Sequence, residues 1–136
     1  MIIRKTITAI PVVLLASLLL SGCAHYSTDV GAFMGIGIQD LEKARKDGKV
    51  ETFPIPFSVA FDEVTKILKD AKLTIYESSK KKGYIVAMGF HKQINTTRVG
   101  IFFESISENR TRITLSSLSS TALEEADAAV FGGLTK

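Results

Sequence analysis

The sequence has 136 residues, 46% of them hydrophobic, which is enough for one domain with its own apolar core. It carries 17 Lys and Arg against 14 Asp and Glu, and two of these cations, Arg4 and Lys5, lie at the extreme N-terminus. Without these two cations the rest of the chain carries 15 Lys and Arg against 14 Asp and Glu. This near-neutral charge argues against a nucleic-acid binder, which would show a basic surplus. The single cysteine, Cys23, excludes a disulfide within the chain.

The first 22 residues are typical of a bacterial export signal. Two cations are followed by the uncharged apolar stretch Ile7–Leu20, which Pro11 interrupts, and small residues precede Cys23. Two alternatives are a plain signal peptide that leaves Cys23 unmodified and a retained membrane helix. The uncharged run barely reaches the roughly 20 residues that a bilayer requires. Pro11 and the small residues at its end therefore favour cleavage.

The motif Leu20-Ser21-Gly22-Cys23 resembles the lipobox of bacterial lipoproteins, an aliphatic residue and two small residues before an obligatory cysteine. The resemblance implies that the Cys23 thiol accepts a diacylglyceryl group, which anchors the chain in the membrane. It also implies that a signal peptidase recognises Leu20, Ser21 and Gly22 and cuts before Cys23. Because Ala24 follows rather than Asp, it further implies an outer-membrane lipoprotein facing the periplasm if the source is Gram-negative.

This interpretation divides the chain into a cleaved signal peptide (1–22), a lipid-anchored tether (23–49) and a small domain (50–136). Removal of residues 1–22 leaves 114 residues, with 15 Lys and Arg against 14 Asp and Glu. In the tether, Gln39–Asp47 carries alternating charges and predicts a short helix that ends at Gly48. The glycine-rich part before it fits either a flexible or loosely docked linker, or an added strand or interaction segment.

A strong helix is predicted after a short extended segment. Val50–Pro56 contains two prolines, which restrict it to an edge or a strand end. From Phe57 to Ala71 apolar residues repeat at spacings of three and four, with Ser58 as the expected cap and lysines gathered near the end.

Four strands are predicted to follow as an antiparallel meander: 73–78, 84–90, 97–104 and 111–118, with turns at 80–83 and 107–109 and a connection at 91–96. Pairing Ser79 with Tyr84 and Phe103 with Ile113 places the large apolar residues on one face, which the helix would cover. This inward face consists of Leu73, Ile75, Val86, Met88, Phe90, Val99, Ile101, Phe103, Ile113 and Leu115.

The C-terminal segment predicts a short second helix. Thr121 and Glu124 match a capping box, Leu123, Ala126 and Val130 share one face, and Gly132-Gly133 is the expected end. The predicted fold class is α+β, a two-layer sandwich of a four-stranded antiparallel meander with one long helix before it and a short C-terminal helix. In its layout, residues 57–118 resemble a family of small bacterial lipoproteins of unknown function, a resemblance that implies no activity.

No residue set after Cys23 indicates an enzyme, a cofactor or a metal site. The two histidines, His25 and His91, are isolated, and no phosphate loop or nucleophile elbow is present. Lys80, Lys81 and Lys82, with cations on neighbouring segments, fit either contact with anionic lipid headgroups or an acidic partner, or a solvated hairpin turn with charged strand edges. The neighbouring cations are Lys92, Arg98, Arg110 and Arg112.

The outer sheet face is less polar than a solvated face should be. It is predicted to carry Tyr76, Ile85 and Phe102, which fit either a docking surface for a partner or a patch covered by Val30–Ile38. The predicted function is a non-catalytic binding or scaffolding module for another envelope protein or a cell-wall polymer. The alternative is a binder of a small apolar or lipid ligand between helix and sheet.

Overall fold

The structure of the protein is a computed structural model that describes residues 37–90 and 97–136. They belong to one compact unit, Ile36–Lys136. This unit includes the helical segment 38–47, which the sequence analysis assigned to the tether. The predicted signal peptide, lipobox and 91–96 connection lie outside the described residues.

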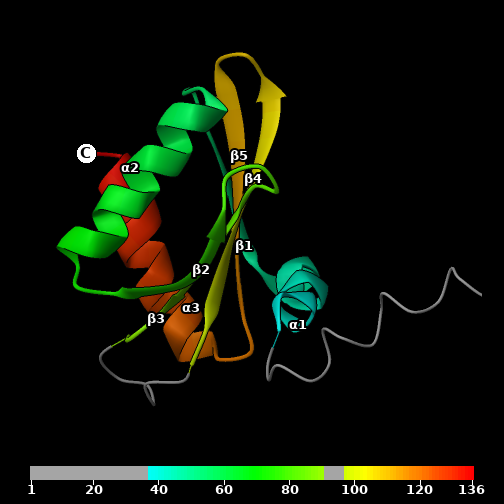
Figure 1. The fold of residues 1–136 in the computed structure, drawn as a ribbon, viewed down its shortest axis with the longest axis vertical. Coiled ribbons are helices and arrows are strands. Elements are labelled where there is room, and N and C mark those ends of the chain that lie inside the picture. The colour runs from blue at the N-terminus through cyan, green and yellow to red at the C-terminus, as the bar shows by residue number, and fades with distance from the viewer. Residues whose placement is uncertain (1–36, 91–96) are drawn as a thin grey trace, which may run out of the picture. The chain divides into compact units, whose positions relative to one another are not determined.

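The described residues form one antiparallel sheet with the strand order β1-β5-β4-β3-β2 (Figure 1). Strand β1 (Lys49–Phe53) lies at the edge beside β5, with Lys49 opposite Leu115 and Phe53 opposite Thr111. The prediction of four strands is therefore wrong, because the extended segment before the prolines is a fifth strand. The remaining strands form the predicted meander: β2 (Thr74–Ser79), β3 (Tyr84–Met88), β4 (Val99–Ser107) and β5 (Arg110–Ser117).

Helix α2 (Phe57–Asp70) connects the two edge strands, β1 and β2 (Figure 1). It begins directly after Pro56, which has extended backbone and provides no side-chain cap. The predicted cap at Ser58 is wrong, because Ser58 already lies in the first turn. At the other end Lys72 has a left-handed backbone (φ 59°), and the Leu73 N–H donates to the Leu68 carbonyl oxygen. This arrangement ends the helix in the way that a C-terminal glycine usually does.

The C-terminal helical segment consists of α3 (Ser120–Ala126), the π turn η4 (Asp127–Phe131) and α4 (Gly132–Leu134). Its cap is Ser119, whose hydroxyl accepts the Ala122 N–H at 3.3 Å, so the predicted cap at Thr121 is wrong. The segment also continues through Gly132 and Gly133 instead of ending there. Gly133 allows a close approach to α2, because a Cβ at this position would lie 2.8 Å from Ile67 Cδ1.

The main core lies between one face of the sheet and the pair formed by α2 and the C-terminal segment (Figure 1). Aromatic rings fill much of it, with 5.1 Å between the ring centroids of Phe61 and Phe103 and 5.6 Å between those of Phe53 and Phe131. Burial of these apolar side chains is the main force that holds the helices on the sheet. The strands contribute eight buried residues to this core: Phe53, Ile85, Ala87, Val99, Ile101, Phe103, Ile113 and Leu115.

The predicted register is confirmed in one hairpin and only partly in the other. Phe103 pairs with Ile113 and Ile101 with Leu115, as expected. In the β2–β3 hairpin Ser79 pairs with Tyr84, but an irregularity between Ile75 and Glu77 shifts the pairing by one residue. Ile75 therefore lies opposite Ala87 rather than Met88.

The bulge lies in β2, so the pairing inferred from the turn assigned residues of β3 to the wrong faces. Ile85 and Ala87 lie in the main core, whereas Val86 lies in a separate cluster on the other face. The assignment of Val86 and Met88 to the inward face is therefore wrong, as is that of Ile85 to the outer face. A bulge adds one residue to a strand, and every side chain beyond it then changes face.

The second face of the sheet is covered by helix α1 (Ile38–Lys43), which continues into the 3-10 turn η3 (Ala44–Asp47). Leu41 is only 1% exposed and packs with Tyr84, Val86 and Phe102 in a second, smaller cluster. Figure 1 shows α1 on the side of the sheet opposite to α2. The fold class is α+β as predicted, but α1 adds a layer that the two-layer prediction lacks.

Candidate functional site

A recess of about 310 Å³ lies on the second face, where α1 and η3 meet the β2–β3 turn. Its apolar lining comes from Ile38 and from aromatic side chains of the strands. Its polar lining comes from two cations, a carboxylate and an amide. The cations are Arg45 and Lys82, the carboxylate is Glu42, and the amide is Gln39. The recess is the candidate functional site because two segments distant in sequence, α1–η3 and the β2–β3 turn, contribute charged groups to one hollow.

Arg45 is held by stacking on an aromatic ring. Its Cζ lies 4.5 Å from the ring centroid of Phe102, and Phe102 is itself only 4% exposed. A guanidinium over an aromatic face is attracted by the ring quadrupole, which fixes the plane of the cation. The Arg45 guanidinium forms no hydrogen bond or ion pair with another residue in the part of the chain that the structure describes. Its donors are therefore available to an anion in the recess.

The backbone of the β2–β3 turn is fixed by local hydrogen bonds. The Gly83 N–H donates to the Ser79 carbonyl oxygen at 2.8 Å, and the Lys82 N–H donates to Ser79 Oγ at 3.2 Å. Gly83 has a φ of +74°, which favours glycine, and a Cβ there would lie 2.7 Å from the Phe103 carbonyl oxygen. These constraints place Lys82 at the recess.

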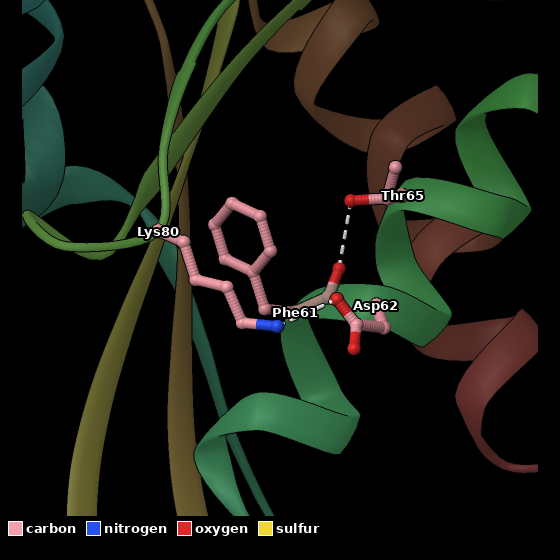
Figure 2. Close-up of polar contacts among 4 residues, drawn as sticks. All are labelled: Phe61, Asp62, Thr65 and Lys80. Atoms are coloured by element: carbon pink, nitrogen blue, oxygen red, sulfur yellow. Dashed lines mark hydrogen bonds and ion pairs between the residues drawn. The ribbon is translucent and has the colours of Figure 1, made fainter.

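The side chain of Lys80, in the same turn, points toward α2 (Figure 2). Its Nζ lies 2.8 Å from Asp62 Oδ1 and 5.7 Å from the ring centroid of Phe61. In the next turn of the helix the Thr65 hydroxyl donates to the Phe61 carbonyl oxygen at 2.8 Å. Lys80 therefore ties the turn to the helix on the main-core side.

The three predicted lysines thus have three different surroundings. Lys80 is paired with Asp62, and Lys82 lines the recess. Lys81 is exposed and has no hydrogen bond or ion pair among residues 37–90 and 97–136. The other cations of the predicted set are also dispersed: Arg112 bonds Glu104, Arg98 stacks on Tyr76, Arg110 is exposed, and Lys92 lies outside the described residues.

Tyr84 lines the recess with a phenol that remains protonated. Its hydroxyl donates to Glu77 Oε1. This hydrogen bond, together with burial of the ring, raises the pKa of Tyr84 to about 12. A phenol with a raised pKa is a poor base or nucleophile at neutral pH. Tyr84 is therefore suited to positioning rather than to proton transfer.

The predicted partner surface is not brought together by the fold. Tyr76 is 47% exposed, but Ile85 is fully buried in the main core on the opposite face. Phe102 lies on the expected face, yet it is covered by Leu41 and Arg45. Of the segment proposed to cover this face, residues 30–36 are outside the described residues, and Ile38 packs against the second cluster.

Sequence reasoning missed the α1 and η3 residues of the recess, Gln39, Glu42 and Arg45. The alternating charges of 39–47 did predict a helix there. Only one residue of α1, Leu41, is buried, so the segment has no apolar stripe to indicate that it packs on a sheet.

Within residues 37–90 and 97–136, no group of three or more His, Cys, Asp or Glu residues could hold a metal ion. None of the helices in this part of the chain has the length and apolar character needed to cross a membrane. Comparisons of the chain with protein-family models and with curated proteins found no match. The resemblance to small bacterial lipoproteins therefore stays a prediction.

Proposed function

We propose that the protein is a lipid-anchored lipoprotein of the bacterial cell envelope whose folded unit is a non-catalytic binding or scaffolding module. The observation that carries this proposal is Leu20-Ser21-Gly22-Cys23, placed directly after an uncharged apolar stretch. Two or more acyl chains are enough for stable attachment of a protein to a membrane. The partner of the module would be another envelope component.

The recess supports binding rather than catalysis. Its cations have no anionic partner within hydrogen-bonding or ion-pairing distance among the described residues. Its titratable phenol, Tyr84, has a raised pKa, which is the wrong direction for a nucleophile. These features favour recognition of a ligand over its chemical conversion.

The alternative, a ligand between helix and sheet, receives less support. The side chains of α2, α3 and the strands pack there directly, and three aromatic rings, those of Phe57, Phe61 and Phe103, contact one another. A ligand would have to displace these contacts. The second face, with its recess, is the better candidate for recognition.

Metabolic labelling with an alkyne fatty acid in a Gram-negative host tests the anchor. The wild-type chain should be labelled and recovered with the outer membrane, whereas Cys23→Ser should be unlabelled and retain residues 1–22. The serine variant is the matched control, because it removes only the nucleophilic sulfur. An unlabelled wild-type chain, or equal labelling of both chains, would contradict the proposal.

A further inference from the structure

We propose that the recess on the second face binds a phosphodiester anion, and that its natural source is the headgroup of an anionic phospholipid. The anion site itself is argued from the recess alone. The assignment of its source rests on the proposed function, because it assumes a chain anchored through Cys23.

Two cations of complementary type face the same hollow. Arg45 offers a flat guanidinium whose paired N–H groups match the spacing of phosphate oxygens. Lys82 offers a compact ammonium at the end of a flexible stem. Neither forms an ion pair with a carboxylate in the part of the chain that the structure describes. An anion bound between them would satisfy both.

The Arg45 guanidinium and the backbone that carries Lys82 are positioned before any ligand arrives. The Arg45 guanidinium stacks on the ring of Phe102, and this ring is itself buried against Leu41 of α1. Lys82 follows a turn fixed by Ser79 and Gly83, and Lys80 ties that turn to Asp62 on the other side (Figure 2). Preorganised groups lose less conformational entropy on binding, which leaves more of their interaction free energy as affinity.

The charge of the recess matches a phosphodiester better than a phosphate monoester. Glu42 also lines the hollow, so two cations and one carboxylate give it a formal charge of +1. A phosphodiester carries one negative charge, whereas a monoester carries between one and two at neutral pH. The Glu42 carboxylate repels the additional charge of the monoester. Lipid headgroups such as phosphatidylglycerol are phosphodiesters.

The position of the recess along the chain favours a membrane ligand. Ile38 lines it, and only 14 residues separate Ile38 from Cys23. Such a segment spans at most roughly 50 Å even when fully extended. If Cys23 carries the anchor, the recess stays within that distance of the lipid surface. Headgroups are then the most concentrated phosphodiesters near it.

The test uses the full-length chain, labelled with ¹⁵N and purified in nonionic detergent. Three soluble probes are titrated separately: glycerophosphoglycerol, which is the deacylated headgroup of phosphatidylglycerol, glycerol phosphate, and uncharged diglycerol. Binding is followed by the amide resonances of Arg45 and Lys82, and thermal unfolding of each variant checks that it is folded. The diester should shift both resonances saturably, and diglycerol should shift neither.

Substitutions in the recess should change affinity in opposite directions. Arg45→Gln and Lys82→Gln should each weaken diester binding about 10-fold, since a charge-assisted hydrogen bond is lost. Glu42→Gln should strengthen it several-fold because a repulsive carboxylate is removed. Lys81→Gln is the matched control on the same turn and should leave affinity unchanged.

The outcomes separate the two sources of phosphate. Tighter binding of the diester supports the headgroup, whereas tighter binding of glycerol phosphate would overturn that source in favour of a soluble monoester. Absence of binding by both, or equal losses in Lys81→Gln and Arg45→Gln, would overturn the anion site. The titration does not depend on acylation, so failure of the Cys23 labelling leaves its result interpretable.

Discussion

The two faces of the sheet are built differently. The face toward α2 buries a large, continuous apolar core that includes five phenylalanines, Phe53, Phe61, Phe90, Phe103 and Phe131. Among the described residues, the face toward α1 buries four apolar residues, Leu41, Tyr84, Val86 and Phe102, together with the polar side chains of Thr114 and Ser116. It also contains the charged recess.

We attribute most of the stability to the face toward α2 and the proposed recognition to the face toward α1. The main core contributes most of the apolar burial and therefore most of the stability of the folded unit. The second face uses a short helix held by one leucine and by a hydrogen bond from the Ser116 hydroxyl to the Leu41 carbonyl oxygen, at 2.7 Å. Because the apolar cluster on this face is small, charged side chains of the recess can lie beside it. Substitutions on the two faces should therefore have different consequences.

The largest effect is expected in the main core. Ile113 is fully buried there, so Ile113→Ala should lower the free energy of unfolding by about 3–4 kcal/mol. Leu41→Ala should cost less, about 2 kcal/mol, because α1 can settle into the space left by the side chain. Urea unfolding followed by circular dichroism measures both. A larger loss in Leu41→Ala than in Ile113→Ala would contradict the division between the faces.

A smaller effect is expected from the buried hydroxyl that holds α1. Ser116→Ala removes the donor to the Leu41 carbonyl oxygen and should cost about 1 kcal/mol. Ser78→Ala, on the exposed edge strand β2, is the control and should change stability little. In hydrogen exchange, Ser116→Ala should increase the opening of α1 more than that of α2. Equal acceleration in both helices would show that the faces do not open separately.

The smallest effect is expected from the phenol beside the recess. Tyr84→Phe removes the hydrogen bond to Glu77 and should cost about 0.5–1 kcal/mol at neutral pH. The fold raises the pKa of Tyr84 from 10 to about 12, which means that it stabilises the protonated phenol. This contribution is fully present below pH 10 and is lost as the pH rises through about 12.

The pH dependence provides the measurement for this prediction. Unfolding by urea at several pH values should show the difference between wild type and Tyr84→Phe shrinking from pH 10 upward. Tyr76→Phe is the control, since Tyr76 is half exposed and a phenylalanine ring can keep its contact with Arg98. A difference that stays constant up to pH 12 would exclude this role of Tyr84.

Local patterns in the sequence predicted the elements that depend on local interactions. The apolar spacing of 57–71 located α2, and the pairing of Phe103 with Ile113 followed from alternation and a short turn. The caps of α2 and α3 were each misplaced by two residues, because several residues near each start can precede a helix and the pattern does not choose among them.

The features that were missed depend on contacts between distant segments. Strand β1 pairs with β5, more than 50 residues away, and only Phe53 of its five residues is buried, so it lacks a clear alternation. The β-bulge near Tyr76 cannot be found from alternation, because both Val86 and Ile85 are apolar and either could face the core. The recess was also missed because it depends on α1 packing against the sheet. Leu41 is the single buried residue of α1, which is too weak a signal in the sequence to predict that packing.

The division between a stabilising face and a recognising face is tested most directly by hydrogen exchange of the acylated chain in lipid nanodiscs. Nanodiscs of phosphatidylcholine alone are compared with nanodiscs containing phosphatidylglycerol. We predict that phosphatidylglycerol slows exchange in α1, η3 and the β2–β3 turn while α2 is unchanged. Slower exchange in α2 with no change around Arg45 and Lys82 would contradict the account.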